Sequence, residues 1–248
     1  MEFLATFLAW LPLAFILLAL WTWIRHRTNP LVAGGFWLGW QSPVDLLAGF
    51  AICLLAVAGI FAIELMLGLL STSWAQAGLT AIVTDLQTLV LAAVLEEVLF
   101  RSLMLSGLVI LLRGNIWLAL LVSAALFGAS HLSNPGATLL GALSNGMGGF
   151  IYGAAFLATR AIWLPIGLHI GWNFGQALFG LPISGMVLPG LFSTFEIGDP
   201  LLTGGDYGPE AGLVGIAFRF VVLALLALYL SLGPGGLKRL TGLGHSPA

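Results

Sequence analysis

Seven stretches of apolar residues, each about as long as a helix that crosses a lipid bilayer, occupy most of the sequence. A spanning helix needs roughly 20 apolar residues in a row, and Gly, Pro, Asn and Arg residues typical of turns separate these stretches. We therefore expect an all-α, multi-pass transmembrane helix bundle with a polar site buried in the membrane. The predicted spans are residues 3–23, 44–70, 79–112, 116–132, 138–158, 161–181 and 212–232.

Composition supports this interpretation. Hydrophobic residues make up 60% of the chain and charged residues only 7%, whereas a soluble domain has about 25% charged residues. We interpret residues 1–248 as one integral membrane domain in contact with a lipid bilayer. The sequence has no basic patch, so we expect no nucleic-acid partner. Cys53 is the only cysteine, which excludes a disulfide within the chain.

The third predicted span, residues 79–112, is too long for one straight crossing. At about 1.5 Å per residue it exceeds a hydrocarbon core of about 30 Å. We expect this segment to tilt, to kink, to project from the membrane, or to consist of two helices.

The positive-inside rule predicts the orientation, because Lys and Arg residues concentrate on the cytoplasmic side of a membrane. With seven spans, every Lys and Arg in a loop or tail falls on one side of the membrane. The Asp and Glu residues of the loops and tails all fall on the other side. The N-terminus is then outside and the C-terminus is cytoplasmic, in the cell membrane; one helix pair more or fewer would preserve this parity. The basic side has Arg25, Arg27, Arg113, Arg160, Lys238 and Arg239, and the other side has Glu2, Glu196, Asp199, Asp206 and Glu210.

Ionisable side chains inside predicted spans are functional-site candidates, because a charge in a bilayer is costly. Two of them, Glu97 and Arg101, are four residues apart and share one face of a helix, so we predict an ion pair between them. Glu96 points away from Arg101 and is left as the freer carboxylate; the alternative is that both glutamates serve Arg101. The candidates are Glu64, Asp85, Glu96, Glu97, Arg101, His131, His169 and Arg219.

Two histidines lie on other segments than this glutamate pair. His131 has Phe127 one turn before it, and His169 has Asn173 one turn after it. A single histidine in a bundle is commonly a hydrogen-bonded packing residue. Two of them, together with an unpaired glutamate, predict one polar pocket.

Such a pocket suits peptide hydrolysis. A Glu and a His can polarise a water molecule, and a second His with an Asn amide can donate hydrogen bonds to an oxyanion. A Glu and two His could instead hold Zn²⁺ with one position open. The sequence contains neither H-E-x-x-H nor G-x-S-x-G, so neither of these protease motifs applies.

Three short motifs give the chain a family resemblance. "EEVLFR" at 96–101 is E-E-x-x-x-R, "FGASH" at 127–131 is F-x-x-x-H, and "HIGWN" at 169–173 is H-x-x-x-N. In this order they resemble the CPBP family of CAAX proteases and bacteriocin-processing enzymes, also called ABI or type II CAAX prenyl endopeptidase-like. The motif-bearing, CPBP-like catalytic core covers residues 91–215.

The resemblance implies a role for each matching residue. Glu96 and His131 would activate water, and His169 and Asn173 would form the oxyanion site. Supporting roles fall to Glu97, Arg101 and Phe127. The family has been described both as metalloproteases and as metal-independent glutamic peptidases. We expect no cofactor, and if a metal such as Zn is present we expect Glu96, His131 and His169 to bind it.

The expected function is an intramembrane endopeptidase acting on a peptide or membrane-protein substrate. One alternative is a non-catalytic CPBP-like membrane protein that binds or assembles another membrane protein in a complex. A transporter or proton relay would need a polar path through the membrane, which one compact site does not provide. Residues 182–211 form either a lid over the site or an exposed connector.

Overall fold

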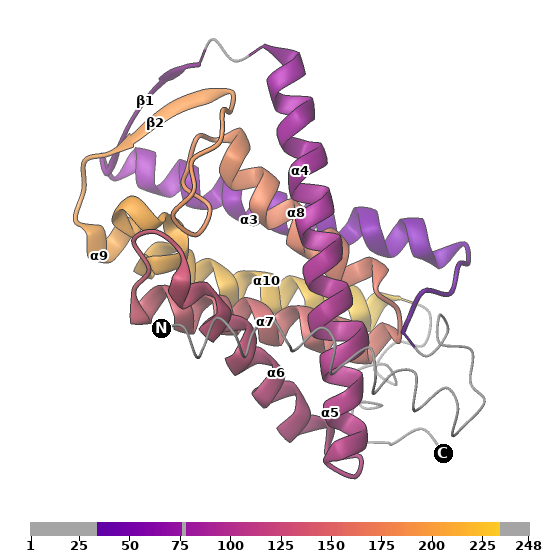
Figure 1. The fold of residues 1–248 in the computed structure, drawn as a ribbon. Coiled ribbons are helices and arrows are strands. Elements are labelled where there is room, and N and C mark those ends of the chain that lie inside the picture. Colours follow the sequence, from indigo (N-terminus) through magenta and orange to yellow (C-terminus); the bar gives the residue numbers. More distant parts are fainter. Residues whose placement is uncertain (1–33, 76–77, 234–248) are drawn as a thin grey trace.

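The computed structural model describes residues 34–75 and 78–233. The predicted span at residues 3–23 lies outside this part of the chain, as do the acidic residue Glu2 and the basic residues Arg25, Arg27, Lys238 and Arg239. Within the described part, the structure is mostly helical (Figure 1). Its longer helices match the predicted spans to within a few residues, except that α4 covers only the first part of the predicted span 79–112. They are α3 (Gln41–Met66), α4 (Leu79–Glu97), α6 (Ile116–Ser130), α7 (Leu139–Thr159), α8 (Trp163–Leu178) and α10 (Leu213–Leu232).

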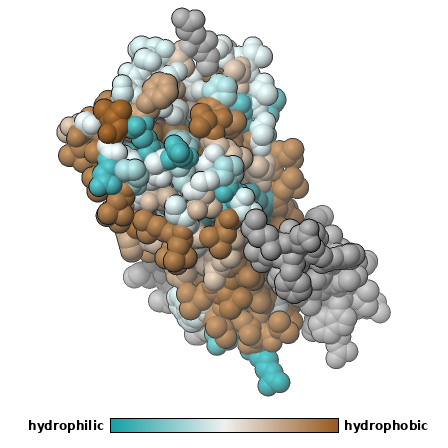
Figure 2. Space-filling model, turned by 60° about the vertical axis from the view of Figure 1, so that its left-hand side comes forward, coloured by the Kyte–Doolittle hydropathy of each residue, from teal (hydrophilic) through white to brown (hydrophobic). Residues whose placement is uncertain are grey.

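Three of the described helices are long and apolar enough to cross a membrane. They are α3, α10, and α6 together with the short 3₁₀ turn η2 (His131–Ser133) that follows it. Large apolar side chains such as Leu47, Leu55 and Leu91 point away from the protein on the outside of the bundle. Figure 2 shows the result, with apolar residues covering most of the lower half of the visible face. A bundle that faces lipid requires such an exterior.

The long third segment is one continuous helical rod. After α4, a π-helical stretch, η1 (Val98–Leu105), leads directly into α5 (Ser106–Leu111), and the rod crosses α3, α7, α8 and α10 steeply in Figure 1. A π-helix widens the turn and displaces backbone hydrogen bonds. Ser123 and Ser106 donate to the carbonyls of Phe100 and Arg101, both at 3.3 Å. The wide turn begins immediately after Glu97.

Helix α8 lies at the centre of the bundle and packs closely against α3. Glycines make this approach possible: a Cβ added to Gly167 would lie 2.1 Å from the carbonyl oxygen of Leu46, and one added to Gly171 would lie 2.3 Å from that of Phe50. Backbones that touch in this way hold two helices in one register. His169 lies between these two glycines, so its position along α3 is tightly defined.

The prediction of an all-α fold is wrong in one detail. Strand β1 (Leu70–Trp74) pairs antiparallel with β2 (Phe192–Glu196), with Leu70 opposite Glu196. Helix α3 ends at Met66, and Gly68 turns the chain with a φ of 69°, so the predicted span 44–70 is too long at its end. Both strands are short and rich in Ser and Thr, which made them resemble loops. Pairing gives their backbone groups hydrogen-bond partners.

Besides strand β2, segment 182–211 contains three short helices. These are α9 (Pro200–Thr203) and the 3₁₀ turns η3 (Gly205–Tyr207) and η4 (Pro209–Ala211). The segment folds back against α7 and α10, and Tyr207 and Glu210 are buried. It is therefore not an exposed connector.

Candidate active site

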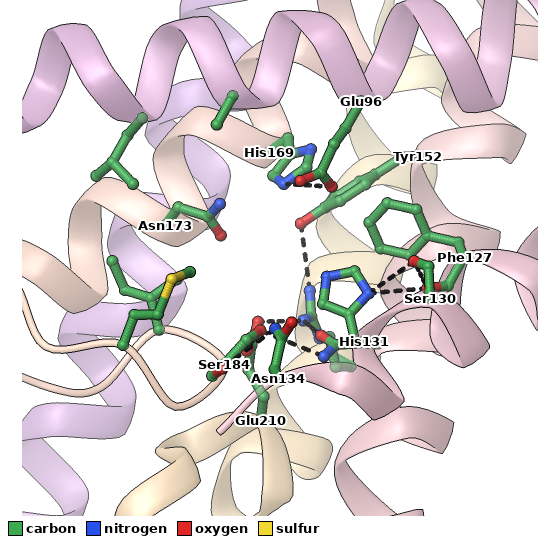
Figure 3. Close-up of a pocket in the computed structure, with 16 residues that line it drawn as sticks. Glu96, Phe127, Ser130, His131, Asn134, Tyr152, His169, Asn173, Ser184 and Glu210 are labelled. Atoms are coloured by element: carbon green, nitrogen blue, oxygen red, sulfur yellow. Dashed lines mark hydrogen bonds and ion pairs between the residues drawn. The ribbon is translucent and has the colours of Figure 1, made fainter. Parts of the chain in front are cut away.

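The four residues expected to carry the chemistry line one cavity of about 190 Å³. Glu96 comes from the end of α4, His131 from the residue that follows α6, and His169 and Asn173 from α8. Figure 3 shows their polar ends directed toward the same space. The structure thus brings together side chains that are up to 77 residues apart (173 − 96).

Glu97 is the buried support of this site. Its Oε2 accepts a hydrogen bond from Nε of Arg101 at 2.8 Å, so the predicted ion pair is present, and both side chains are fully buried. Its Oε1 lies 2.9 Å from Nδ1 of His169. This second contact was not predicted. One carboxylate therefore joins the π-helical turn to α8 and orients the imidazole of His169.

Glu96 differs from its neighbour, as the helical spacing predicts. Its side chain is 38% exposed, and its Oε2 lies 3.9 Å from Nε2 of His169. That oxygen has no hydrogen-bond partner among the described residues. Glu96 thus keeps a carboxylate oxygen available beside the cavity, whereas both oxygens of Glu97 are used.

The backbone determines which nitrogen of His131 carries a proton. Nδ1 lies 2.8 Å from the carbonyl oxygen of Phe127. A carbonyl only accepts hydrogen bonds, so Nδ1 must be the donor. In the neutral ring, Nε2 then has a free lone pair. Figure 3 shows this edge of the ring facing the cavity, so His131 presents a proton acceptor there.

Aromatic rings hold both imidazoles in place. The centroid of the Phe127 ring lies 4.8 Å from that of His131 and 5.9 Å from that of His169. The guanidinium of Arg101 lies over the Phe127 ring, 4.8 Å from its centroid, and makes a cation–π contact with it. Tyr152 stacks on His169 with centroids 5.1 Å apart. Phe127 thus contacts both imidazoles and the guanidinium of Arg101.

A second buried ion pair forms the opposite wall of the cavity. Nη2 of Arg219 on α10 lies 3.2 Å from Oε1 of Glu210 in η4, and both side chains are almost fully buried. Arg219 also lies 3.6 Å from the ring centroid of Trp172, and Trp172 Nε1 donates to Glu210 at 2.9 Å. Glu210 was expected in a loop on the acidic side of the membrane; it does lie in the connecting segment 182–211, and there it is buried. A buried Arg needs a counter-charge, and that rule applied to Arg219 would have pointed to a nearby acid.

Segment 182–211 completes the cavity. Ile183, Ser184 and Met186 line it together with Glu210, and Ser184 donates a short hydrogen bond to Glu210. Asn134, just after His131, donates to the carbonyl oxygen of Ser184 at 3.2 Å. Of the two expectations for this segment, the structure favours the lid, since these residues cover one side of the site.

Other candidates stay outside this cavity. Neither Glu64 nor Asp85 lines it, although both lie in predicted spans. Within residues 34–75 and 78–233, no three His, Cys, Asp or Glu side chains are grouped as ligands of one metal ion. This includes Glu96, His131 and His169, the set expected to bind a metal if one is used. The residues do not fit a metal site, so we derive no step through a metal.

The fold and the cavity define a class of protein: a helix bundle with a lipid-compatible exterior and a Glu–His–His–Asn site inside it. The family model described as type II CAAX prenyl endopeptidase Rce1-like matches residues 78–175. The chain therefore carries an Rce1-like domain over this stretch, which includes all three motifs, and the resemblance to the CPBP family is confirmed. No curated protein and no solved structure matched the chain. Glu210 and Arg219 lie outside the matched residues.

Proposed function

We propose that this protein is an intramembrane endopeptidase that hydrolyses a peptide bond with water activated by Glu96 and His131. The observation that carries this proposal is the convergence of Glu96, His131, His169 and Asn173 on one cavity. Family membership of residues 78–175 supports the same reaction class. The substrate is a peptide or a segment of a membrane protein that enters the bundle from the side of this cavity.

Activation of water requires a proton acceptor near the attacking oxygen. Glu96 offers a carboxylate oxygen without a partner among the described residues, and His131 offers the lone pair of Nε2. A water molecule between them would donate to both groups. As its oxygen attacks the carbonyl carbon of the substrate, one proton passes to Glu96.

The tetrahedral intermediate carries a negative oxygen that needs hydrogen-bond donors. The Asn173 amide has donors of its own. His169 can donate from Nε2 only when both ring nitrogens are protonated, because Nδ1 already faces Glu97 at 2.9 Å. Glu97 and Glu96 both lie beside this ring, and their negative charge favours the imidazolium that the oxyanion requires.

Collapse of the intermediate completes the reaction. The C–N bond breaks, and the proton held by Glu96 passes to the leaving nitrogen, so that an amine and a carboxylic acid are released. Glu96 thus acts first as base and then as acid. All proton transfers in this sequence take place between Glu96, water and the leaving nitrogen. The remaining residues orient these groups or stabilise the negative oxygen.

Comparative proteomics of membranes tests the proposal. Membranes from cells that produce wild-type protein should contain peptide termini that are absent with Glu96→Gln or His131→Ala. Asp85→Asn is the matched control, because it changes a carboxylate to an amide on the same helix outside the cavity. It should give the wild-type pattern.

The result decides between catalysis and the assembly alternative. Identical termini from wild type and Glu96→Gln, with the same co-purified membrane protein in both, would contradict hydrolysis and favour an assembly factor. Thermal unfolding in detergent should show that Glu96→Gln is close to wild type in stability, because the contact of Glu96 with Nε2 of His169 is long, at 3.9 Å, and the Glu96 side chain is 38% exposed.

A further inference from the structure

Tyr152 on α7 has a hydroxyl group that none of the roles above uses. Its side chain is buried, and it lines the cavity. In Figure 3 its oxygen points toward the space between His169, Asn173 and His131. Because its ring stacks on His169, the hydroxyl lies next to the group that would stabilise the oxyanion.

The hydrogen-bond pattern leaves the proton of this hydroxyl unused. Nη1 of Arg219 donates to the Tyr152 oxygen at 3.3 Å. A guanidinium has donors only, so the phenol oxygen must be the acceptor in this contact. A phenol keeps its proton at neutral pH. No residue of the described part accepts that proton, so it can be donated into the cavity.

Arg219 also makes this hydroxyl a stronger donor. The guanidinium stays in place because Glu210, Trp172 and the carbonyl oxygen of the Asn145 side chain all contact it. A fixed positive charge behind the oxygen polarises the O–H bond, and hydrogen bonds in such chains strengthen one another. The buried ion pair of Arg219 and Glu210 thereby supports a hydroxyl that faces the reaction.

We propose that Tyr152 is a third oxyanion donor, acting with Asn173 and His169, and that Arg219 positions and polarises it. This inference rests on the proposed function. In the reaction it adds no proton transfer: the Tyr152 O–H donates a hydrogen bond to the negative oxygen and keeps its proton when the C–N bond breaks. Preorganised donors of this kind act on the transition state and hardly on the bound substrate.

Tyr152→Phe tests the proposal, because Phe keeps the ring that stacks on His169 and removes only the hydroxyl. Loss of one oxyanion donor costs about 10²–10³ in kcat, and KM should stay within about twofold. Tyr207→Phe is the matched control. Tyr207 is a buried phenol that accepts from Asn145 at 2.9 Å, in the same polar network, but does not line the cavity. It should lose stability without losing kcat.

A binding measurement separates catalysis from structure. With a peptide that wild type cleaves, Glu96→Gln and the double variant Glu96→Gln/Tyr152→Phe should bind with the same Kd. A wild-type kcat in Tyr152→Phe, or an equal loss of kcat in Tyr207→Phe, would overturn the role of Tyr152 while leaving the endopeptidase proposal in place. A tenfold weaker Kd in the double variant would also overturn it, because Tyr152 would then act on binding. Failure of wild type to cleave any peptide would overturn both.

Discussion

Glu97 Oε1 lies 2.9 Å from Nδ1 of His169, so a carboxylate on α4 holds an imidazole on α8. The other oxygen of Glu97 is occupied by Arg101. A carboxylate that accepts a hydrogen bond from one ring nitrogen of a histidine fixes the orientation of the ring and keeps a proton on that nitrogen. The two neighbouring glutamates therefore have separate tasks, since Glu97 holds the site and Glu96 faces the cavity.

Replacing Glu97 with Gln should destabilise the protein strongly. The change leaves Arg101 fully buried without a counter-charge, and breaking a buried pair in this way costs about 3–5 kcal/mol. The free energy of unfolding, measured in detergent with a denaturant, should fall by this amount. Glu96→Gln is the matched substitution at the next residue and should stay close to wild type. Equal stability of the two variants would mean that the Glu97 contacts contribute nothing to folding.

The parts of the site that could be predicted depend on short-range geometry. The pairing of Glu97 with Arg101 follows from a spacing of four residues on a helix. The same rule separates Glu96 from Arg101 and places Phe127 beside His131. Apolar stretches and turn residues were enough to locate the helices, because a spanning segment must satisfy its own backbone hydrogen bonds.

The parts that could not be predicted depend on how distant segments pack. His169 is 72 residues from Glu97, and no local pattern links them. Glu210 belongs to a segment with the composition of an outer loop, yet the fold buries it against Arg219. The π-helical turn at Val98–Leu105 has no amino-acid pattern that distinguishes it from an α-helix. It depends on contacts with another segment, such as the hydrogen bond from Ser123 on α6.

The ion pair of Arg219 and Glu210 should be energetically coupled. Arg219→Met leaves a buried carboxylate unpaired, at a cost of about 3–5 kcal/mol, and Glu210→Gln leaves a buried guanidinium in the same position. The double variant Arg219→Met/Glu210→Gln removes both charges. Its loss in free energy of unfolding should be smaller than the sum of the two single-variant losses by about 0.5–3 kcal/mol. Unfolding of all four proteins in one detergent gives this coupling energy. Strict additivity would show that the pair is not coupled.

The predicted orientation can be tested with single cysteines. Cys53 is the only native cysteine and is fully buried, so Cys53→Ala gives a suitable background. A cysteine at Arg113 should react with a membrane-impermeant thiol reagent only from the cytoplasmic side, and one at Asp199 only from outside. The opposite pattern would reverse the topology, and labelling of both positions from one side would mean that the number of spans between them is wrong.

Glu196 should make stability depend on pH. Burial, with the carboxylate of Asp206 nearby, raises the pKa of Glu196 above its ordinary value in the folded protein. The folded state therefore binds more protons than the unfolded state, so the stability that Glu196 contributes is full below its unfolded pKa. That contribution is lost as the pH rises through the folded pKa. Thermal midpoints in detergent should show this decline from acidic toward neutral pH.

The variant Glu196→Gln isolates this effect from other titrating groups. Gln has nearly the shape of the protonated acid and carries no charge at any pH. The variant should therefore be more stable than wild type at neutral pH and about equal to it in acid, with the difference growing as the pH rises. A difference between the two proteins that stays constant with pH would show that Glu196 titrates alike in the folded and unfolded states. Because Glu196 lies on β2, away from the cavity, its replacement should leave kcat unchanged.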